Sequence, residues 1–119
     1  MTFYEKNASA DSSLIAPGNH TGKSSVTARK LDSLAAELGL EGIRLLKIEG
    51  EGAEPEILAG GTDTLARTTY CTVDCGPERG ASEAHVVAEV CNHMCGCNFE
   101  VVDVNLERQI FLFRNRSAT

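Results

Sequence analysis

Three carboxylates lie close together near the middle of this 119-residue chain. Glu49, Glu51 and Glu54 fall within six residues and surround Gly50 and Gly52, directly after a short apolar run. Carboxylates this close raise one another's pKa, which is the property that a general acid needs near neutral pH. Solvated turn acids at the N-terminus of a following helix would give the same pattern. The three glutamates are therefore candidate catalytic acids, with a structural role as the alternative.

A second polar group follows the next apolar run. Asp74, Glu78 and Arg79 come just after residues 69–74. In open parallel sheets ligands bind beyond the carboxyl ends of the strands, so these residues are candidates for substrate binding. Arg79 is suited to hold a substrate carboxylate, and it is equally suited to pair with Glu78 or with a facing glutamate.

The elements that must position these residues alternate along the chain. Hydrophobic spacing predicts strands over 26–31, 43–48, 69–74, 99–104 and 109–113. The strand over 43–48 is mostly apolar and is expected to be buried on both faces. Caps and glycine stops predict helices from Asp32 to Gly39, from Glu54 to Gly60 and from Ser82 to Gly96. The last two strands are separated by a four-residue loop and must form an antiparallel hairpin. This order predicts an α/β fold, with parallel strands and helices and an antiparallel C-terminal edge.

Composition predicts a single domain over 1–119, with an N-terminal arm and polar loop over 1–25 and a core over 26–119. The net charge of −6 gives no footprint for nucleic acid or for an anionic membrane surface. There is no apolar run of about 18 residues, and the first residues lack the features of a signal peptide. We therefore expect a cytoplasmic protein without nucleic-acid or membrane partners.

The five cysteines are expected to be reduced and mostly buried. Cys91, Cys95 and Cys97 form the densest group, and His85 lies nearby, but their spacing does not suit a structural zinc site. We predict no metal. A redox pair of Cys95 and Cys97 remains an alternative.

The segment from Leu45 to Gly61 resembles the signature of the FkbM family of S-adenosylmethionine-dependent methyltransferases. Lys30-Leu31-Asp32 and Ser12-Ser13-Leu14 resemble two further family features upstream. The resemblance implies a class I methyltransferase fold, which is Rossmann-like, and O-methylation as the usual activity. The family usually has aspartate at the position of Glu49 and valine at the position of Gly50. These departures affect any role that depends on strict geometry at that turn.

The resemblance places the cofactor on the first three strands of the complete fold, with a glycine-rich loop after the first. Nothing over 1–40 resembles that loop. The chain therefore resembles the C-terminal half of the fold, and we expect it to bind no cofactor by itself. The cofactor-binding residues are unknown, and S-adenosylmethionine would bind only if a partner completed the site.

Without the first three strands, the strand over Ile43–Ile48 becomes an edge, and an apolar edge tends to pair with another chain. We expect a homo-oligomer through this edge, unless residues 3–4 or 26–31 fold back to cover it. Three functions follow. The first is a truncated methyltransferase-like domain that is not catalytic alone and binds a small molecule or a protein partner. The second is a functional half of a methyltransferase, completed by another chain. The third is a structural oligomerisation module.

Overall fold

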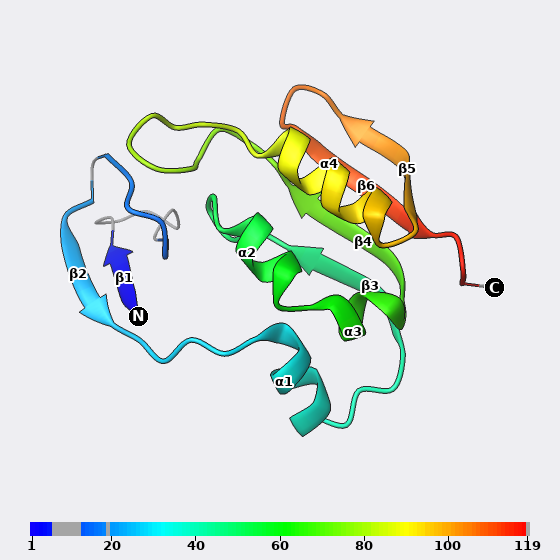
Figure 1. The fold of residues 1–119 in the computed structure, drawn as a ribbon. Coiled ribbons are helices and arrows are strands. Elements are labelled where there is room, and N and C mark those ends of the chain that lie inside the picture. The colour runs from blue at the N-terminus through cyan, green and yellow to red at the C-terminus, as the bar shows by residue number, and fades with distance from the viewer. Residues whose placement is uncertain (6–12, 19, 119) are drawn as a thin grey trace.

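The computed structural model of the chain describes residues 1–5, 13–18 and 20–118. The strands are β1 (Thr2–Glu5), β2 (Gly22–Ser25), β3 (Ile43–Ile48), β4 (Thr68–Asp74), β5 (Phe99–Asn105) and β6 (Ile110–Asn115). The helices are α1 (Leu31–Glu37), α2 (Glu54–Ala59), α3 (Thr62–Ala66) and α4 (Val87–Gly96). The N-terminal strands lie to one side of the other elements (Figure 1).

The main sheet has four strands in the order β3-β4-β6-β5. β3 and β4 are parallel, β6 is antiparallel to both β4 and β5, and β5 therefore runs in the same direction as β4. The predicted mixed α/β class, the parallel pair and the C-terminal hairpin are all confirmed. β6 lies inside the sheet and β5 forms the edge. The more apolar of the two hairpin strands thus takes the interior position.

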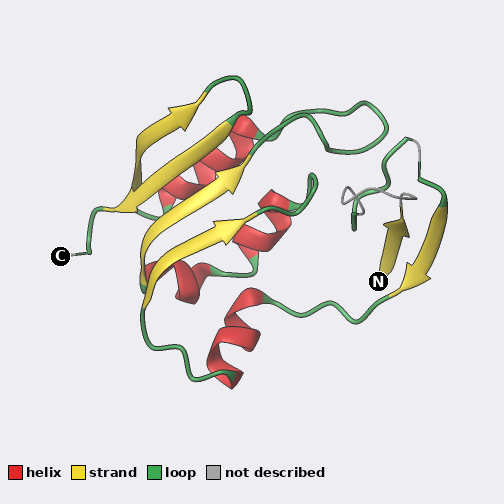
Figure 2. Cartoon of the chain, turned by 180° about the vertical axis from the view of Figure 1, so that it is seen from behind, coloured by secondary structure: helices red, strands yellow, loops and turns green. Residues whose placement is uncertain are grey.

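The helices lie on one face of this sheet, and no described helix covers the other face (Figure 2). The core forms between them and the strands, and its largest fully buried side chains include Phe99, Phe113, Leu58, Leu65 and Met94. The predicted apolar stripe of α4 is confirmed, because Val86, Val90 and Met94 are buried.

The prediction that β3 is buried on both faces is wrong. Leu46 and Ile48 face the helices and join the core, whereas Leu45 points to the uncovered face and is 58% exposed. Alternating side chains of a strand point to opposite faces, so one layer of helices can bury only half of them. The prediction that β3 is an edge strand is confirmed for the described residues.

The N-terminal strands form a separate hairpin, in which β1 and β2 are antiparallel. The predicted strand over 26–31 is wrong, since residues 26–30 form an extended connection and α1 begins at Leu31. Neither β1 nor this connection pairs with β3, so the alternative in which the N-terminal segment covers this edge does not occur among the described residues. Ser12 and the rest of the polar loop over 6–12 lie outside the described residues.

Two predicted helix starts are also wrong. α4 begins after Val86 rather than at Ser82, because residues 76–86 form a loop that crosses to α2. Asp32 was expected to cap its own helix, but it lies within α1. Its carboxylate accepts hydrogen bonds from the N–H groups of Asp63 and Thr64 and from the Thr64 hydroxyl, at 3.1, 2.8 and 2.6 Å. Asp32 therefore caps α3, and these bonds lower its pKa.

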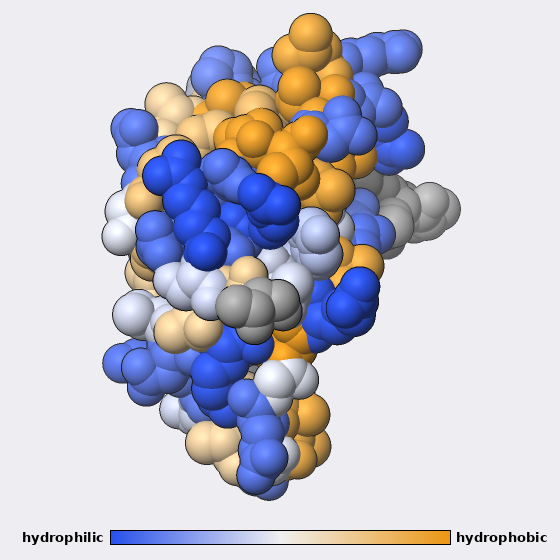
Figure 3. Space-filling view, turned by 90° about the vertical axis from the view of Figure 1, so that its right-hand side faces the viewer, coloured by the Kyte–Doolittle hydropathy of each residue, from blue (hydrophilic) through white to orange (hydrophobic). Residues whose placement is uncertain are grey.

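The surface has its own apolar areas. Val101, Val102 and Leu106 are exposed on the β5–β6 hairpin, and apolar atoms gather on the upper part of the face seen in Figure 3. None of the helices in the described part of the chain has the length and hydropathy needed to cross a membrane.

The cap of α3 gives a stability prediction. Asp32→Ala removes the acceptor of three hydrogen bonds and should lower the free energy of unfolding by about 1–2 kcal/mol. Urea denaturation followed by circular dichroism measures this change. Glu41→Ala, an exposed acid in the loop before β3, should change stability by less than about 0.5 kcal/mol. Equal stability of the two variants would contradict the assignment.

Candidate functional site

The turn between β3 and α2 is built around a buried carboxylate. Glu54 is only 1% exposed, and its Oε1 accepts hydrogen bonds from the N–H groups of Gly50 and Gly52, at 2.7 and 3.4 Å. Its Oε2 is buried without a hydrogen-bond partner among the described residues. Burial raises the pKa of Glu54, and the two N–H groups oppose the rise.

Close packing explains both glycines of this turn. A Cβ on Gly50 would lie 2.6 Å from Cδ1 of Ile57 on α2. Gly52 has a φ of +97°, and a Cβ there would lie 2.6 Å from the Cα of Arg79. A side chain at Gly52 is therefore excluded both by conformation and by the loop that crosses over it.

Arg79 fixes that loop to the turn. Its guanidinium donates to both carboxylate oxygens of Glu56, at 2.8 and 2.5 Å, and to the carbonyl of Gly52, at 2.6 Å. Glu56 holds the pKa of Arg79 above its ordinary value. Of the roles expected for Arg79, the structure therefore places it in an ion pair with a facing glutamate.

Glu78 carries the most strongly perturbed carboxyl group of the site. Its pKa is raised to about 7, mainly by burial, and in addition by the nearby carboxylates of Glu51, Asp74 and Glu54 and by a hydrogen bond between Glu78 and Glu51. One Glu78 oxygen is buried without a hydrogen-bond partner among the described residues. The group is poised to exchange a proton near neutral pH.

Five of the six predicted site residues thus gather at the carboxyl ends of β3 and β4. Glu51, Glu54, Asp74 and Glu78 act on one another electrostatically, and Arg79 packs over the turn that carries two of them. Glu49 differs, because it is exposed and forms an ion pair with Lys47 at 2.6 Å.

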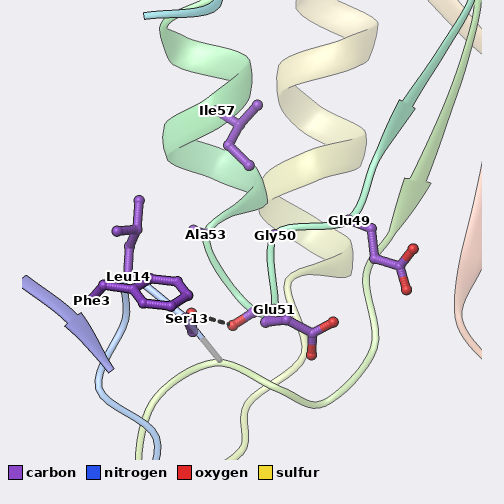
Figure 4. A pocket seen from close by; sticks show the side chains of 8 residues that line it. All are labelled: Phe3, Ser13, Leu14, Glu49, Gly50, Glu51, Ala53 and Ile57. Carbon is purple, nitrogen blue, oxygen red and sulfur yellow. Dashed lines mark hydrogen bonds between the residues drawn. The ribbon is translucent and has the colours of Figure 1, made fainter. Parts of the chain in front are cut away.

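A cavity of about 460 Å³ opens beside this turn. Phe3 and Leu14 of the N-terminal arm lie on one side of it, and Ala53 and Ile57 of α2 lie on the other (Figure 4). The buried Ser13 ties the arm to the turn, since its hydroxyl donates to the carbonyl of Glu51 at 2.8 Å.

Two residues of this site are not predicted from the sequence. One is Glu56, whose pairing with Arg79 spans 23 residues of chain. The other is Ser13, noted only for a family resemblance. Neither position carries a local signal of its partner, because both partners come from distant segments.

The cysteines do not contribute to the site. All five are free thiols, and burial raises the pKa of Cys71 and Cys75 to about 12, so neither forms a thiolate readily. The expectation that the thiols are mostly buried is confirmed only for Cys71 and Cys75, since Cys91 and Cys97 are half-buried and Cys95 is exposed. Within the described parts of the chain, no three His, Cys, Asp or Glu side chains are placed to hold a metal ion.

The raised pKa of Glu78 predicts a pH-dependent stability. Between about pH 4.5 and pH 7 the folded chain keeps this proton and the unfolded chain loses it, so stability falls as the pH rises. Glu78→Gln stays neutral and should be more stable than the wild type at about pH 8, by on the order of 1 kcal/mol after solvent screening. At about pH 4.5 the two proteins should differ little.

Urea denaturation at both pH values tests this effect. Glu83→Gln, at an exposed position in the same loop, should unfold like the wild type at each pH. A gain for Glu78→Gln that is equal at both pH values would rule out titration of Glu78 as its cause.

A model of the methyltransferase FkbM domain matches residues 2–107. A similar curated protein is the 2-O-methyltransferase NoeI of Sinorhizobium fredii (strain NBRC 101917 / NGR234), which is 33% identical over 86 residues. That alignment covers 59% of this chain and 35% of the relative, so the chain spans about a third of the length of the protein it matches. No solved structure matches the chain. The family match covers most of the chain, and the chain belongs to the FkbM methyltransferase domain family.

Proposed function

We propose that this chain is a truncated, methyltransferase-type domain that is not catalytic alone and binds a small molecule beside its acidic turn, as part of an oligomer. One observation carries the proposal: the family's signature turn lines a cavity of about 460 Å³, while the strand that leads into it is an open edge. The turn offers carboxyl groups to a ligand, and Glu78 beside it titrates near neutral pH.

The described residues of this chain do not fit S-adenosylmethionine on their own. The glycine turn over 50–52 is already filled, by Ile57 against Gly50 and by Arg79 against Gly52. Ionised carboxylates only accept hydrogen bonds, so Glu51 and Glu54 offer no donor to the carboxylate of the cofactor's amino acid group. Cofactor binding would therefore need residues from another chain, and no reaction step is assigned to this chain alone.

The open edge of β3 supports oligomerisation. The N–H of Ile43 bonds to the carbonyl of Arg67 next to β4, so alternation directs the N–H groups of Arg44 and Leu46 to the outside. Leucines of α1, of the segment that follows it and of β3 itself are exposed, namely Leu34, Leu38, Leu40 and Leu45. Unpaired backbone groups beside apolar side chains favour the addition of a strand from a second copy.

A functional half of an O-methyltransferase is the second candidate. The family match over 2–107 favours it, because the chain retains the segments of a methyltransferase domain that surround the acidic turn. In this case the same edge would receive a strand from a chain that carries the cofactor. A purely structural oligomer would use the edge and leave the cavity without a ligand.

Titration calorimetry with S-adenosylmethionine separates the two candidates. The isolated chain should give no binding heat at millimolar cofactor, because its turn is filled and its ionised carboxylates offer no donor to the cofactor's carboxylate. Heat with a micromolar dissociation constant would overturn the proposal and favour the functional half. Glu54→Gln serves as a control, since it removes one carboxylate and should not create binding.

Replacement of one edge residue tests the oligomer. Arg44→Pro removes an outward N–H without breaking a bond to β4, so the wild type should sediment as a dimer at micromolar concentrations and this variant as a monomer. Arg44→Ala keeps the N–H and should remain a dimer. Circular dichroism must show that both variants are folded. A monomeric wild type, or a folded dimeric Arg44→Pro, would contradict pairing through this edge.

A further inference from the structure

The cavity beside the acidic turn continues into a second one. The second cavity has a volume of about 390 Å³ and lies between the N-terminal arm, α1 and α2. Leu14, Ala53 and Ile57 line both cavities. Together the two cavities form one elongated groove under the arm, which we call the arm groove.

The middle of the arm groove is apolar. Phe3 and Leu14 line it from the arm, Ile57 from α2 and Leu34 from α1. Leu34 is 40% exposed although it lies on the helix face that borders the groove. Binding of a hydrocarbon chain over such a surface is favourable, by roughly 0.8 kcal/mol for each methylene group that leaves water.

The two ends of the arm groove differ in charge. Arg29 and Lys30 line the end near α1, and Glu49 and Glu51 line the end at the turn. Lys30 lies close to Gly60, since a Cβ added to Gly60 would lie 3.6 Å from the Cβ and Cγ atoms of Lys30. The ammonium group of Lys30 forms no ion pair with a described residue.

The remaining charged groups at the basic end are already engaged. Glu56 also lines this end, but Arg79 neutralises its carboxylate through two hydrogen bonds. Arg29 pairs with the exposed Glu37. The end of the arm groove near α1 therefore carries the positive charge of Lys30, which an anionic ligand can bind.

We propose that the arm groove binds an elongated amphiphile with an anionic head group, the head at Lys30 and the hydrocarbon tail along Leu14 and Ile57. The acidic turn repels an anion, so the charge fixes the direction of the ligand. The tail then ends beside Gly50. This inference rests on the proposed function in that both place a small molecule at the acidic turn.

Octanoate, 1-heptanol and heptylammonium carry the same seven-carbon tail with a negative, a neutral and a positive head, and calorimetry measures the affinity of each. Octanoate should bind about threefold more tightly than 1-heptanol, as expected for one exposed ion pair. Heptylammonium should bind more weakly than both. Shortening the tail to hexanoate should weaken binding about tenfold, since two methylene groups no longer leave water.

Matched variants locate the site. Leu34→Asp places an acid in the wall and should weaken octanoate binding at least about tenfold, whereas Leu38→Asp lies on the same helix but outside both cavities and should leave it unchanged. Lys30→Glu should remove the preference for octanoate over heptylammonium, and Lys23→Glu on β2 should keep it.

Several results would overturn the inference: no octanoate binding at millimolar concentration, equal affinity for octanoate and heptylammonium, or unchanged binding in Leu34→Asp. A wild-type dimer that binds neither octanoate nor S-adenosylmethionine would leave the edge pairing intact and remove only the amphiphile. Octanoate binding by a monomeric wild type would support the amphiphile and remove only the edge pairing. The failures of the two proposals are therefore distinguishable.

Discussion

The buried carboxylate of Glu54 holds together the part of the molecule on which the other contacts depend. It accepts hydrogen bonds from two N–H groups of the preceding turn and so fixes the chain where β3 ends and α2 begins. The carbonyls of that turn then face outward. Arg79 donates to one of them and Ser13 to another. One tight turn thus receives both the loop after β4 and the N-terminal arm, and its own conformation depends on an acid that water does not reach.

This arrangement concentrates negative charge at one end of the sheet. Burying a carboxylate costs free energy unless hydrogen bonds or cations compensate it. Glu54 is compensated by backbone N–H groups, whereas Glu78 faces other carboxylates and keeps its proton to about pH 7. The guanidinium of Arg79, which crosses the turn, is bound to Glu56. The site therefore combines a fixed acid with a titrating one, which is an arrangement that suits proton exchange or the binding of a positive group.

The sheet itself is buried on one side only. Helices cover the face that carries Leu46, Cys71 and Phe113, and alternation of the strands leaves Leu45 on the uncovered face. β3 is exposed in a second direction as well, because no described strand pairs with its outer edge. An apolar strand that is open both at its edge and on one face exposes unpaired backbone groups and apolar side chains to water. This physical imbalance is the reason why an assembly is proposed for a chain of this family.

The sequence by itself determined the elements whose signals are local. Hydrophobic spacing and glycine stops predicted β3, β4, α2 and the hairpin of β5 and β6, and the signature segment identified the family before any geometry was known. Local patterns also indicated that acids would meet at the ends of β3 and β4, because parallel strands end at the same edge.

Only the tertiary structure decided which partners these residues have. Asp32 was expected to cap its own helix and instead caps α3, about thirty residues away. Arg79 reaches Glu56, and Ser13 reaches the turn at Glu51. A hydrogen-bonding side chain shows in the sequence that it needs a partner, but many residues could meet that need. The choice depends on which segments folding brings within about 3 Å of it, and packing of the whole core sets that distance.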